Sequence, residues 1–135
     1  MTHMYRALMA LWFLCSADVA YAAPAAVEHV VDGDTLYVTM DGRTVKVRLA
    51  HVDTPEVGVN AKCARERERG DAASAFAKSL MPIGTTVDVQ PTGKTERWGR
   101  LLADVRIGRL DLGAELLRRG LAAPYDGRTK PDWCR

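Results

Sequence analysis

Several residue types and patterns are scarce in this sequence of 135 residues, and each scarcity excludes a class of protein. There are three cysteines and three histidines, and neither His29 nor His51 stands at a zinc-ligand spacing from a cysteine, so a zinc site is not expected. The apolar run in residues 7–17 has 11 residues, too few for a helix that spans a bilayer. No contiguous calcium loop of the EF-hand type is present. The net charge of +2 permits an anionic partner without requiring one.

The first 22 residues have the features of a secretory signal peptide. One positive charge in MTHMYR precedes the apolar run, and residues 20–22 (AYA) follow it with a small-x-small cleavage pattern. We therefore expect a signal peptide in residues 1–22, export to the periplasm or the extracellular space, and one domain in residues 23–135 without membrane association. A membrane anchor and a buried first helix are the alternatives.

Removal of the signal peptide would leave two cysteines, Cys63 and Cys134. An even number of cysteines in an oxidising compartment favours a disulfide. This bond would close a loop of about 70 residues and, in the chain-entropy model, stabilise the fold by about 4 kcal/mol. Two unpaired buried thiols are the alternative.

Short runs rich in β-branched and aromatic residues predict five strands. Asp41-Gly42 separates two of them and is a strong signal for a two-residue hairpin turn. A long helix is predicted after the third strand, and a short helix, capped by Asp111 and ended by Gly120, after the fifth. The expected strands cover residues 27–31, 35–39, 44–52, 85–90 and 101–107, the helices cover residues 64–80 and 112–119, and residues 23–26, 91–97 and 121–135 are expected to be irregular.

Three strands, a helix, two strands and a helix suit a five-stranded OB-fold barrel with an inserted helix and a short C-terminal helix. The expected fold class is therefore mainly β with α, and a generic α+β sheet is the alternative. In the long helix, Ala72, Phe76 and Leu80 are spaced to form the buried stripe. The charged half of that helix, RERERGD, is expected to be solvated, because its signs alternate.

Two aspartates in residues 31–56 stand at the ends of predicted strands. Asp34 follows a strand that a turn interrupts, and Asp53 ends the strand that returns from the hairpin. In a barrel the ends of neighbouring strands can meet, so both carboxylates and a loop carbonyl could share one cation site. Oxygen ligands of this kind suit Ca²⁺, whereas Mg²⁺ demands stricter octahedral geometry. Each aspartate could instead serve only its own turn.

Chemistry on a phosphate ester is indicated by three further residues, Glu56, Arg48 and Arg100. Glu56 follows Asp53 across the rigid Pro55 and could act as a general base on a water molecule. The planar forks of the two arginines could bind phosphate oxygens in pairs. These residues suit a metal-assisted attack on a phosphate ester, and a lone surface glutamate with two surface ion pairs is the alternative.

In order and spacing, these motifs resemble the staphylococcal nuclease (thermonuclease) family. DGDT at residues 32–35 is followed by RLAHVDTPE at 48–56 and, after the predicted long helix, by ERWGR at 96–100. The similarity runs from about residue 27 to residue 125 and includes the segment DLGAELLRRGLA. The resemblance implies an OB-fold barrel and a calcium-dependent endonuclease that hydrolyses DNA and RNA and leaves 3′-phosphate ends.

The resemblance also implies a role for each matching motif position. The matching positions are Asp34, Asp53 and the carbonyl of Thr54 for Ca²⁺, Arg48 and Arg100 for the phosphate, Glu56 for catalysis, and Asp32 just outside the metal ligands.

Tyr125 lies near a tyrosine of the family that packs on the nucleotide, and Trp98 replaces a family tyrosine beside Arg100. Both aromatic residues could stack on bases, and Trp98 could equally belong to the core. The family's additional C-terminal helix has no counterpart here, and the expected bond between Cys63 and Cys134 would pin the tail in its place. We expect a monomer that acts on DNA and RNA. A non-catalytic OB-fold module that binds single strands or oligosaccharide is the alternative, and a phosphodiesterase for small nucleotides is a third.

Overall fold

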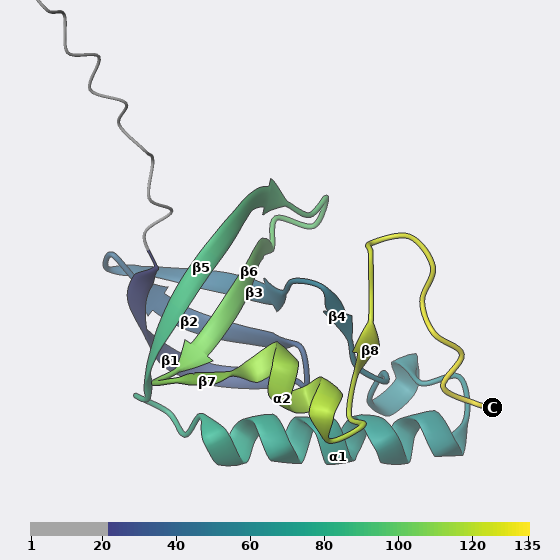
Figure 1. Cartoon of the computed structure of the whole chain (residues 1–135). Helices are drawn as coiled ribbons and strands as arrows, with labels where there is room; N and C mark the ends of the chain where they lie inside the picture. The colour runs from purple at the N-terminus through teal and green to yellow at the C-terminus, as the bar shows by residue number, and fades with distance from the viewer. Residues whose placement is uncertain (1–21) are drawn as a thin grey trace, which may run out of the picture.

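The computed structural model describes residues 22–135, so all but the last residue of the expected signal peptide lies outside the described part. Figure 1 shows a barrel of strands with a long helix across one end and an irregular C-terminal segment beside it. The strands are β1 (Ala23–Asp32), β2 (Thr35–Met40), β3 (Arg43–Leu49), β4 (Val52–Asp53), β5 (Thr86–Thr95), β6 (Leu101–Ile107), β7 (Leu110–Asp111) and β8 (Ala123–Pro124), and the helices are the 3-10 turn η1 (Gly58–Asn60), α1 (Ala64–Leu80) and α2 (Leu112–Arg118).

The five long strands close into a barrel because β3 pairs with β2 on one side and with β6 on the other. The order around the barrel is β3-β2-β1-β5-β6, and the parallel pairing of β3 with β6 closes the ring. Alternate residues point inward and fill the interior with branched aliphatic side chains, among them Val38, Val47, Val89 and Val105. The predicted five-stranded OB-fold barrel is confirmed.

Two segments that we expected to be irregular are parts of strands. Residues 23–26 begin β1 and pair with β5. Residues 91–95 continue β5, with an irregular register against β6. Each segment contains a proline, Pro24 or Pro91, which cannot donate a ladder hydrogen bond. In the closed barrel, each segment has a neighbouring strand with which it pairs, and the local sequence does not indicate that neighbour.

The third strand ends earlier than predicted. β3 stops at Leu49, and the chain turns at Ala50 and His51 before it resumes as β4. His51 has a φ of 66°, a left-handed conformation that is uncommon outside glycine and that residue alternation does not indicate. This turn directs β4 away from the barrel and towards β8, with which it pairs.

Helix α1 has the predicted bounds, but a different face of it is buried. Phe76 and Leu80 are only half-buried, and Ala72 is exposed. Most side chains on the buried face are small, so the helix can approach the barrel closely. The buried carboxylate of Glu66 accepts hydrogen bonds from backbone N–H groups. The prediction that the whole charged half is solvated is therefore wrong for Glu66. The buried residues of α1 are Glu66, Gly70, Ala73, Ser74 and Ala77.

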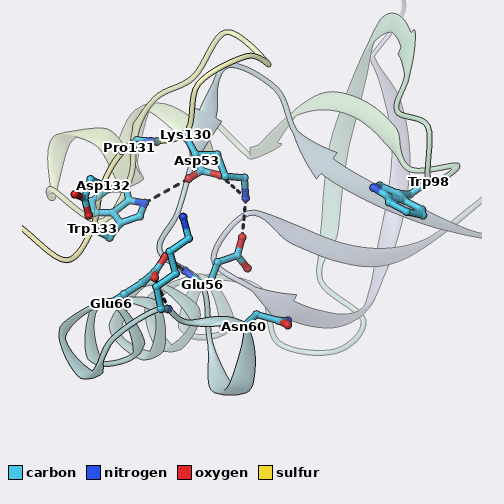
Figure 2. Close-up of a pocket in the computed structure, with 10 residues that line it drawn as sticks. Asp53, Glu56, Asn60, Glu66, Trp98, Lys130, Pro131, Asp132 and Trp133 are labelled. Atoms are coloured by element: carbon cyan, nitrogen blue, oxygen red, sulfur yellow. Dashed lines mark hydrogen bonds and ion pairs between the residues drawn. The ribbon is translucent and has the colours of Figure 1, made fainter.

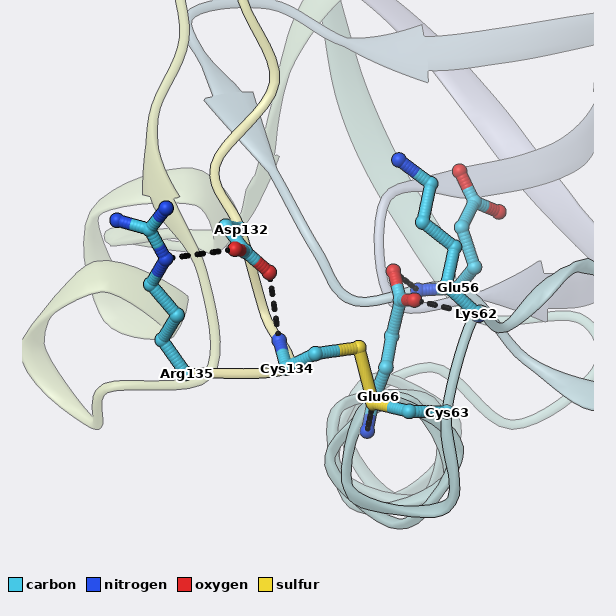
Figure 3. Close-up of a disulfide and its surroundings, with 7 residues drawn as sticks. All are labelled: Glu56, Lys62, Cys63, Glu66, Asp132, Cys134 and Arg135. Carbon is cyan, nitrogen blue, oxygen red and sulfur yellow. Dashed lines mark hydrogen bonds and ion pairs between the residues drawn. A yellow bond between two sulfur atoms is a disulfide. The ribbon is translucent and has the colours of Figure 1, made fainter.

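The C-terminal segment returns to the start of α1, where Cys134 and Cys63 form the predicted disulfide (Figure 3). Their Cα atoms are 6.1 Å apart, within the usual range for such a bond. Cys63 also caps α1, because its Sγ atom accepts a hydrogen bond from the backbone N–H of Glu66. The segment is otherwise irregular, as predicted, except for β8. Across residues 22–135, every helix is too short or too polar to cross a membrane.

Candidate active site

Arg48 stands at the centre of the predicted cluster and is only 4% exposed. Its Nη2 atom lies 3.3 Å from Oδ2 of Asp34 and 3.1 Å from Oδ1 of Asp53. Its Nη1 atom donates hydrogen bonds to the carbonyls of Leu49 at 2.7 Å and Val52 at 2.8 Å. A buried ion pair adds little net stability, because the loss of hydration offsets the attraction. We therefore infer that the function of this arrangement is to hold the positive charge of Arg48 beside the carboxylates of Asp34 and Asp53.

The turn between β1 and β2, which carries Asp34, packs against α1 and Thr54. A Cβ atom at Gly33 would lie 2.8 Å from Cβ of Ala73 and 2.9 Å from Cγ2 of Thr54, so the close approach requires glycine. Asp34 accepts hydrogen bonds from the backbone N–H of Thr54 at 2.9 Å and from the hydroxyl of Thr35 at 3.0 Å. Asp34 and Thr54, two of the predicted calcium ligands, are therefore in direct contact.

Helix α1 positions the backbone of Glu56 through a glycine and a buried carboxylate. A Cβ atom at Gly70 would collide with the carbonyl oxygen of Glu56 and lie 2.8 Å from that of Pro55. Glu66 accepts hydrogen bonds from the backbone N–H groups of Lys62 at 2.7 Å and Glu56 at 3.4 Å. In the sequence, Gly70 indicated only a position of low helix propensity. Its contribution to the site comes from a contact 14 residues away, which no local pattern displays.

Arg100 immediately precedes β6 and faces the same cluster. Its Nη2 atom forms an ion pair with Oε2 of Glu96, and its buried Nε atom has no hydrogen-bond partner among residues 22–135. These side chains border a small cleft of about 90 Å³ that collects most of the predicted site residues. The cleft is lined by Asp32, Asp34, Arg48, Glu56, Glu96, Arg100, Tyr125 and Lys130.

The two predicted base-stacking residues lie in different places. Tyr125 borders the small cleft, with Cζ of Arg48 5.9 Å from the centre of its ring. Trp98 is 72% exposed, which excludes the alternative that it belongs to the core. Trp98 instead lines a larger cleft of about 820 Å³, together with Asp53 and Glu56 (Figure 2). Asp53 thus faces the larger cleft, while Glu56 borders both.

Two residues of the C-terminal segment enter the site without any motif that indicated them. The Nζ atom of Lys130 lies 2.6 Å from Oε1 of Glu56 and 3.5 Å from Oδ1 of Asp53 (Figure 2). The Nε1–H group of Trp133 donates a hydrogen bond to Oδ2 of Asp53 at 3.3 Å. Cys134 was the available signal, because its disulfide fixes this segment close to the residues that follow Glu56.

Crowded carboxyl groups shift the pKa values of the cluster. Burial and the charge of Asp34 raise the pKa of Asp32 from 3.8 to about 7. Burial also raises the pKa of Asp53, against the opposing charge of Lys130. Burial lowers the pKa of Lys130, but its hydrogen bond to Glu56 and the charge of Asp53 outweigh this and raise the pKa above its usual value. Burial is thus the main cause of the raised pKa values of Asp32 and Asp53.

The donor atoms present fit a hard divalent cation. Asp34 and Asp53 bring carboxylate oxygens to one guanidinium, and oxygen atoms are the ligands that such a cation prefers. Within residues 22–135, no three His, Cys, Asp or Glu side chains form a group that could hold a metal ion. The predicted ligand set differs from such a group, since it joins two carboxylates to the backbone carbonyl of Thr54. These ligands stay a prediction.

Fold and cluster together define a small OB-fold domain with an acid- and arginine-rich cleft at its rim. The family described as Staphylococcal nuclease homologue matches residues 46–132, which is more than half of the chain. The protein belongs to the staphylococcal nuclease family.

Several relatives extend this comparison. Thermonuclease of Staphylococcus intermedius is 37% identical over 100 residues, which cover 71% of this chain and 56% of that protein. The SPbeta prophage-derived endonuclease YokF and the endonuclease YncB, both of Bacillus subtilis (strain 168), are 33% and 32% identical over 107 residues. These two alignments cover 76% of this chain and 36% and 50% of the relatives. The chain thus spans between about a third and just over half of the length of these proteins.

Proposed function

We propose that the protein is an endonuclease that requires Ca²⁺, hydrolyses phosphodiester bonds of DNA and RNA, and leaves 3′-phosphate ends. The observation that carries this proposal is the convergence of Asp34, Arg48, Glu56 and Arg100 on one cleft. Family membership supports it, as do the names of the relatives, one a thermonuclease and two of them endonucleases.

Asp34, Asp53 and the carbonyl of Thr54 would hold the cation. A bound calcium ion would stabilise negative charge that develops on the oxygens of the reacting phosphate. Asp32 supports this ligand set from outside, because its carboxylate accepts a hydrogen bond from the backbone N–H of Asp34 at 3.1 Å and so fixes the turn.

Arg48 and Arg100 would bind the phosphate. Four fixed contacts hold the guanidinium of Arg48, so little side-chain entropy is lost when it binds an oxygen. The buried Nε–H group of Arg100 has no hydrogen-bond partner within residues 22–135, so a phosphate oxygen that reached it would satisfy this donor. Both guanidinium groups would offset the charge on a five-coordinate phosphorus.

Glu56 would act on the attacking water. The water oxygen bonds to phosphorus, and Glu56 accepts a proton from the water. The bond from phosphorus to the 5′ oxygen breaks, and that oxygen leaves with the electron pair and takes a proton from solvent to become the 5′-hydroxyl. Lys130 holds Oε1 of Glu56, which leaves Oε2 for the water. The side chain of Glu56 is 33% exposed, so solvent can reach it.

The decisive experiment incubates the protein with plasmid DNA and with RNA, once with Ca²⁺ and once with excess chelator. We expect both polymers to be cut only with Ca²⁺. The new 5′ ends should be hydroxyl groups that polynucleotide kinase labels without prior phosphatase treatment, because the phosphate stays on the 3′ end. Ends that need phosphatase first would contradict the proposed product.

Glu56→Gln tests the assigned base and should lower kcat by about 10²- to 10⁴-fold, the usual contribution of a general base. Glu68→Gln, at an exposed position of α1, is the matched control and should keep full activity. Equal kcat values in the two variants would remove Glu56 from the mechanism.

We also propose that the chain is exported and monomeric. The disulfide between Cys63 and Cys134 supports an oxidising compartment. Fractionated cells should contain the protein outside the cytoplasm, with an intact mass that lacks residues 1–22, and size-exclusion chromatography should give the volume of one chain. A cytoplasmic protein of full mass would contradict export.

A further inference from the structure

Glu56, the proposed base, is held at two points, and both lead to the disulfide. Its backbone N–H group donates a hydrogen bond at 3.4 Å to Oε1 of Glu66, in the first turn of α1. Its own Oε1 atom lies 2.6 Å from Nζ of Lys130, in the C-terminal segment (Figure 2). Cys63 caps α1, and Cys134 follows Lys130 closely in the sequence. The disulfide therefore joins the two elements that hold Glu56 (Figure 3).

The contact on the side of α1 does not need the disulfide. Glu66 is 4% exposed and also accepts a hydrogen bond from the backbone N–H of Lys62 at 2.7 Å. Sγ of Cys63 accepts a hydrogen bond from the backbone N–H of Glu66 at 3.3 Å, which the sulfur of a free thiol can do as well. Helix α1 itself packs against β1. The backbone of Glu56 is therefore expected to keep its place when the bond opens.

The contact on the side of the C-terminal segment orients the carboxylate. Lys130 is the charged partner of this carboxylate within residues 22–135, and the side chain of Glu56 is 33% exposed. A glutamate that no partner holds samples several rotamers, so its Oε2 atom would face the attacking water for only part of the time. A general base acts only within hydrogen-bond reach of the proton that it accepts. The pair with Lys130 thus favours the orientation in which the base can act.

Lys130 stays beside Glu56 only while its segment is anchored. The side chain of Lys130 is half-exposed, and exposed charge pairs contribute little free energy. Trp133 also ties the segment to the site, through its hydrogen bond to Asp53. The disulfide is the covalent anchor. Opening it gives the segment back its conformational freedom, which these two polar contacts do not offset.

We propose that Lys130 is a positioning residue for Glu56 and that the disulfide makes this role depend on oxidation. In the oxidised protein, Lys130 holds Oε1 of Glu56 and leaves Oε2 for the water. A dithiol reductant opens the bond: it supplies two electrons and two protons, becomes a disulfide itself, and leaves Cys63 and Cys134 as thiols. In the reduced protein the carboxylate loses its partner, and hydrolysis slows. The inference rests on the proposed function, because Glu56 is the base of that function.

This dependence would limit hydrolysis inside the cell that makes the protein. Thiols stay reduced in the cytoplasm, whereas disulfides form and persist in the compartments to which export leads. Full activity would therefore begin only after the proposed export.

The first test measures kcat and KM for cleavage of plasmid DNA at saturating Ca²⁺. Lys130→Met should lower kcat about 10-fold, because the base is correctly oriented for less of the time. Lys130→Arg keeps a positive partner for the carboxylate and should stay within about threefold. Lys78→Met, at an exposed position of α1, is the control and should keep the kcat of the unaltered protein. An unchanged kcat in Lys130→Met would overturn the role.

A second background separates positioning from other roles of the lysine. In protein that carries Glu56→Gln, Lys130→Met should leave the remaining kcat within about twofold, because there is no base left to orient. A lysine that only bound the phosphate, or only stabilised the fold, would lower the activity equally in both backgrounds. Equal losses in the two backgrounds would therefore overturn the positioning role.

Reduction tests the dependence on the disulfide. Dithiothreitol should lower kcat of the oxidised protein about 10-fold and should have no effect on the double variant Cys63→Ser and Cys134→Ser, whose kcat is already low. Adding Lys130→Met to the double variant should cause no further loss. Circular dichroism reports whether the barrel is intact, and full kcat in an intact double variant would overturn the dependence. The Lys130 variants keep the bond, so they test the positioning role even if the double variant does not fold.

One further readout needs neither Ca²⁺ nor catalysis. In protein labelled with ¹³C at the glutamate carboxyl groups, Glu56→Gln identifies the resonance of Glu56 by its loss. That resonance should shift in Lys130→Met, and reduction of the unaltered protein should move it to the same position. A resonance that stays in place in Lys130→Met would overturn the contact itself.

Failure of this inference and failure of the proposed function give different results. If the protein cuts DNA with Ca²⁺ but Lys130→Met keeps full kcat, the function stands and the positioning role is wrong. If the Glu56 resonance moves as expected but the protein never cuts, the contact and its dependence on the disulfide stand and the proposed function is wrong.

Discussion

At the scale of single residues, the site consists of motif residues and of residues that no motif displays. The motifs that resemble the family singled out Asp34, Arg48 and Glu56, which line one cleft, and their roles stay a prediction. Gly70 and Lys130 could not be predicted, because each acts through a contact with a residue far away in sequence. Such contacts follow from the closed barrel and the disulfide, which place distant segments together only after the chain has folded.

Replacing Gly70 by alanine separates helix propensity from site geometry. Alanine favours a helix over glycine by about 1 kcal/mol, but its Cβ atom would collide with the carbonyl oxygen of Glu56. We expect Gly70→Ala to lower the free energy of unfolding by about 1–3 kcal/mol, as overpacking does, and to lower kcat by about 10- to 100-fold as Glu56 shifts. Urea unfolding and DNA cleavage measure the two effects.

Asp71→Ala is the control, since Asp71 is exposed at the next position of the same helix. It should change the free energy of unfolding by less than about 0.5 kcal/mol and leave kcat as it is. A Gly70→Ala protein that is more stable and fully active would contradict the role assigned to the glycine.

Lys130 and a divalent cation would compete for the same carboxylate. Nζ of Lys130 lies 3.5 Å from Oδ1 of Asp53, a predicted calcium ligand. Lys130→Met removes a positive neighbour of the cation, and we expect Ca²⁺ to bind about 3- to 10-fold more tightly, a gain of about 1 kcal/mol that matches one screened charge pair. Isothermal titration calorimetry measures this affinity without substrate. Lys78→Met, at an exposed site on α1, is the control, and weaker Ca²⁺ binding by the Lys130 variant would refute the competition.

At the scale of elements, the bounds of helices and strands were predicted well where they depend on local sequence signals alone. The bounds of α1 and β6 are as expected, and α2 begins at its Asp111 cap. Elements that depend on a partner were predicted poorly. β1 is longer than expected because residues 23–26 pair with β5, and β5 is longer because residues 91–95 continue along β6. The buried face of α1 includes a carboxylate because backbone N–H groups are nearby.

Helix α2 offers a test of stability against pH. The carboxylate of Glu115 accepts hydrogen bonds from Arg118 and Arg119, which lower its pKa from 4.5 to about 2. Because the folded pKa lies below the unfolded one, this stabilisation is complete above about pH 4.5 and is lost as pH falls towards 2. Glu115→Gln should therefore lower the urea midpoint at pH 7, and the difference from the unaltered protein should shrink below pH 4.5. A difference that stays constant down to pH 3 would contradict the assignment.

At the scale of the whole molecule, the order of elements favoured a barrel but left an α+β sheet open, and the resemblance to the family implied the OB-fold barrel. Alternating strands have few ways to close, and the ring of β3, β2, β1, β5 and β6 is the arrangement that leaves no free edge. The path of the C-terminal segment across the site could not be predicted, because residues 125–135 contain no periodic pattern. A disulfide fixes only one point of such a segment.

The disulfide should stabilise the whole fold measurably. Cys63 and Cys134 are 71 residues apart in the sequence, and closing a loop of that length is worth about 4 kcal/mol in the chain-entropy model. We expect reductant to lower the free energy of unfolding by about 2–4 kcal/mol in urea titrations. The double variant Cys63→Ser and Cys134→Ser should show the lower value with or without reductant. Identical midpoints for the oxidised and reduced protein would show that the bond constrains only the tail.

The same bond turns most of the domain into a covalent ring. The end of β5 exposes Lys94, and the connection to β6 exposes Arg97. Trypsin-like proteases cut after residues of this kind. A single cut there would open the ring but release no fragment, because Cys63 and Cys134 would still join the two pieces. A nicked molecule would keep its strands paired around the barrel, and the damage would become visible as two chains only after reduction.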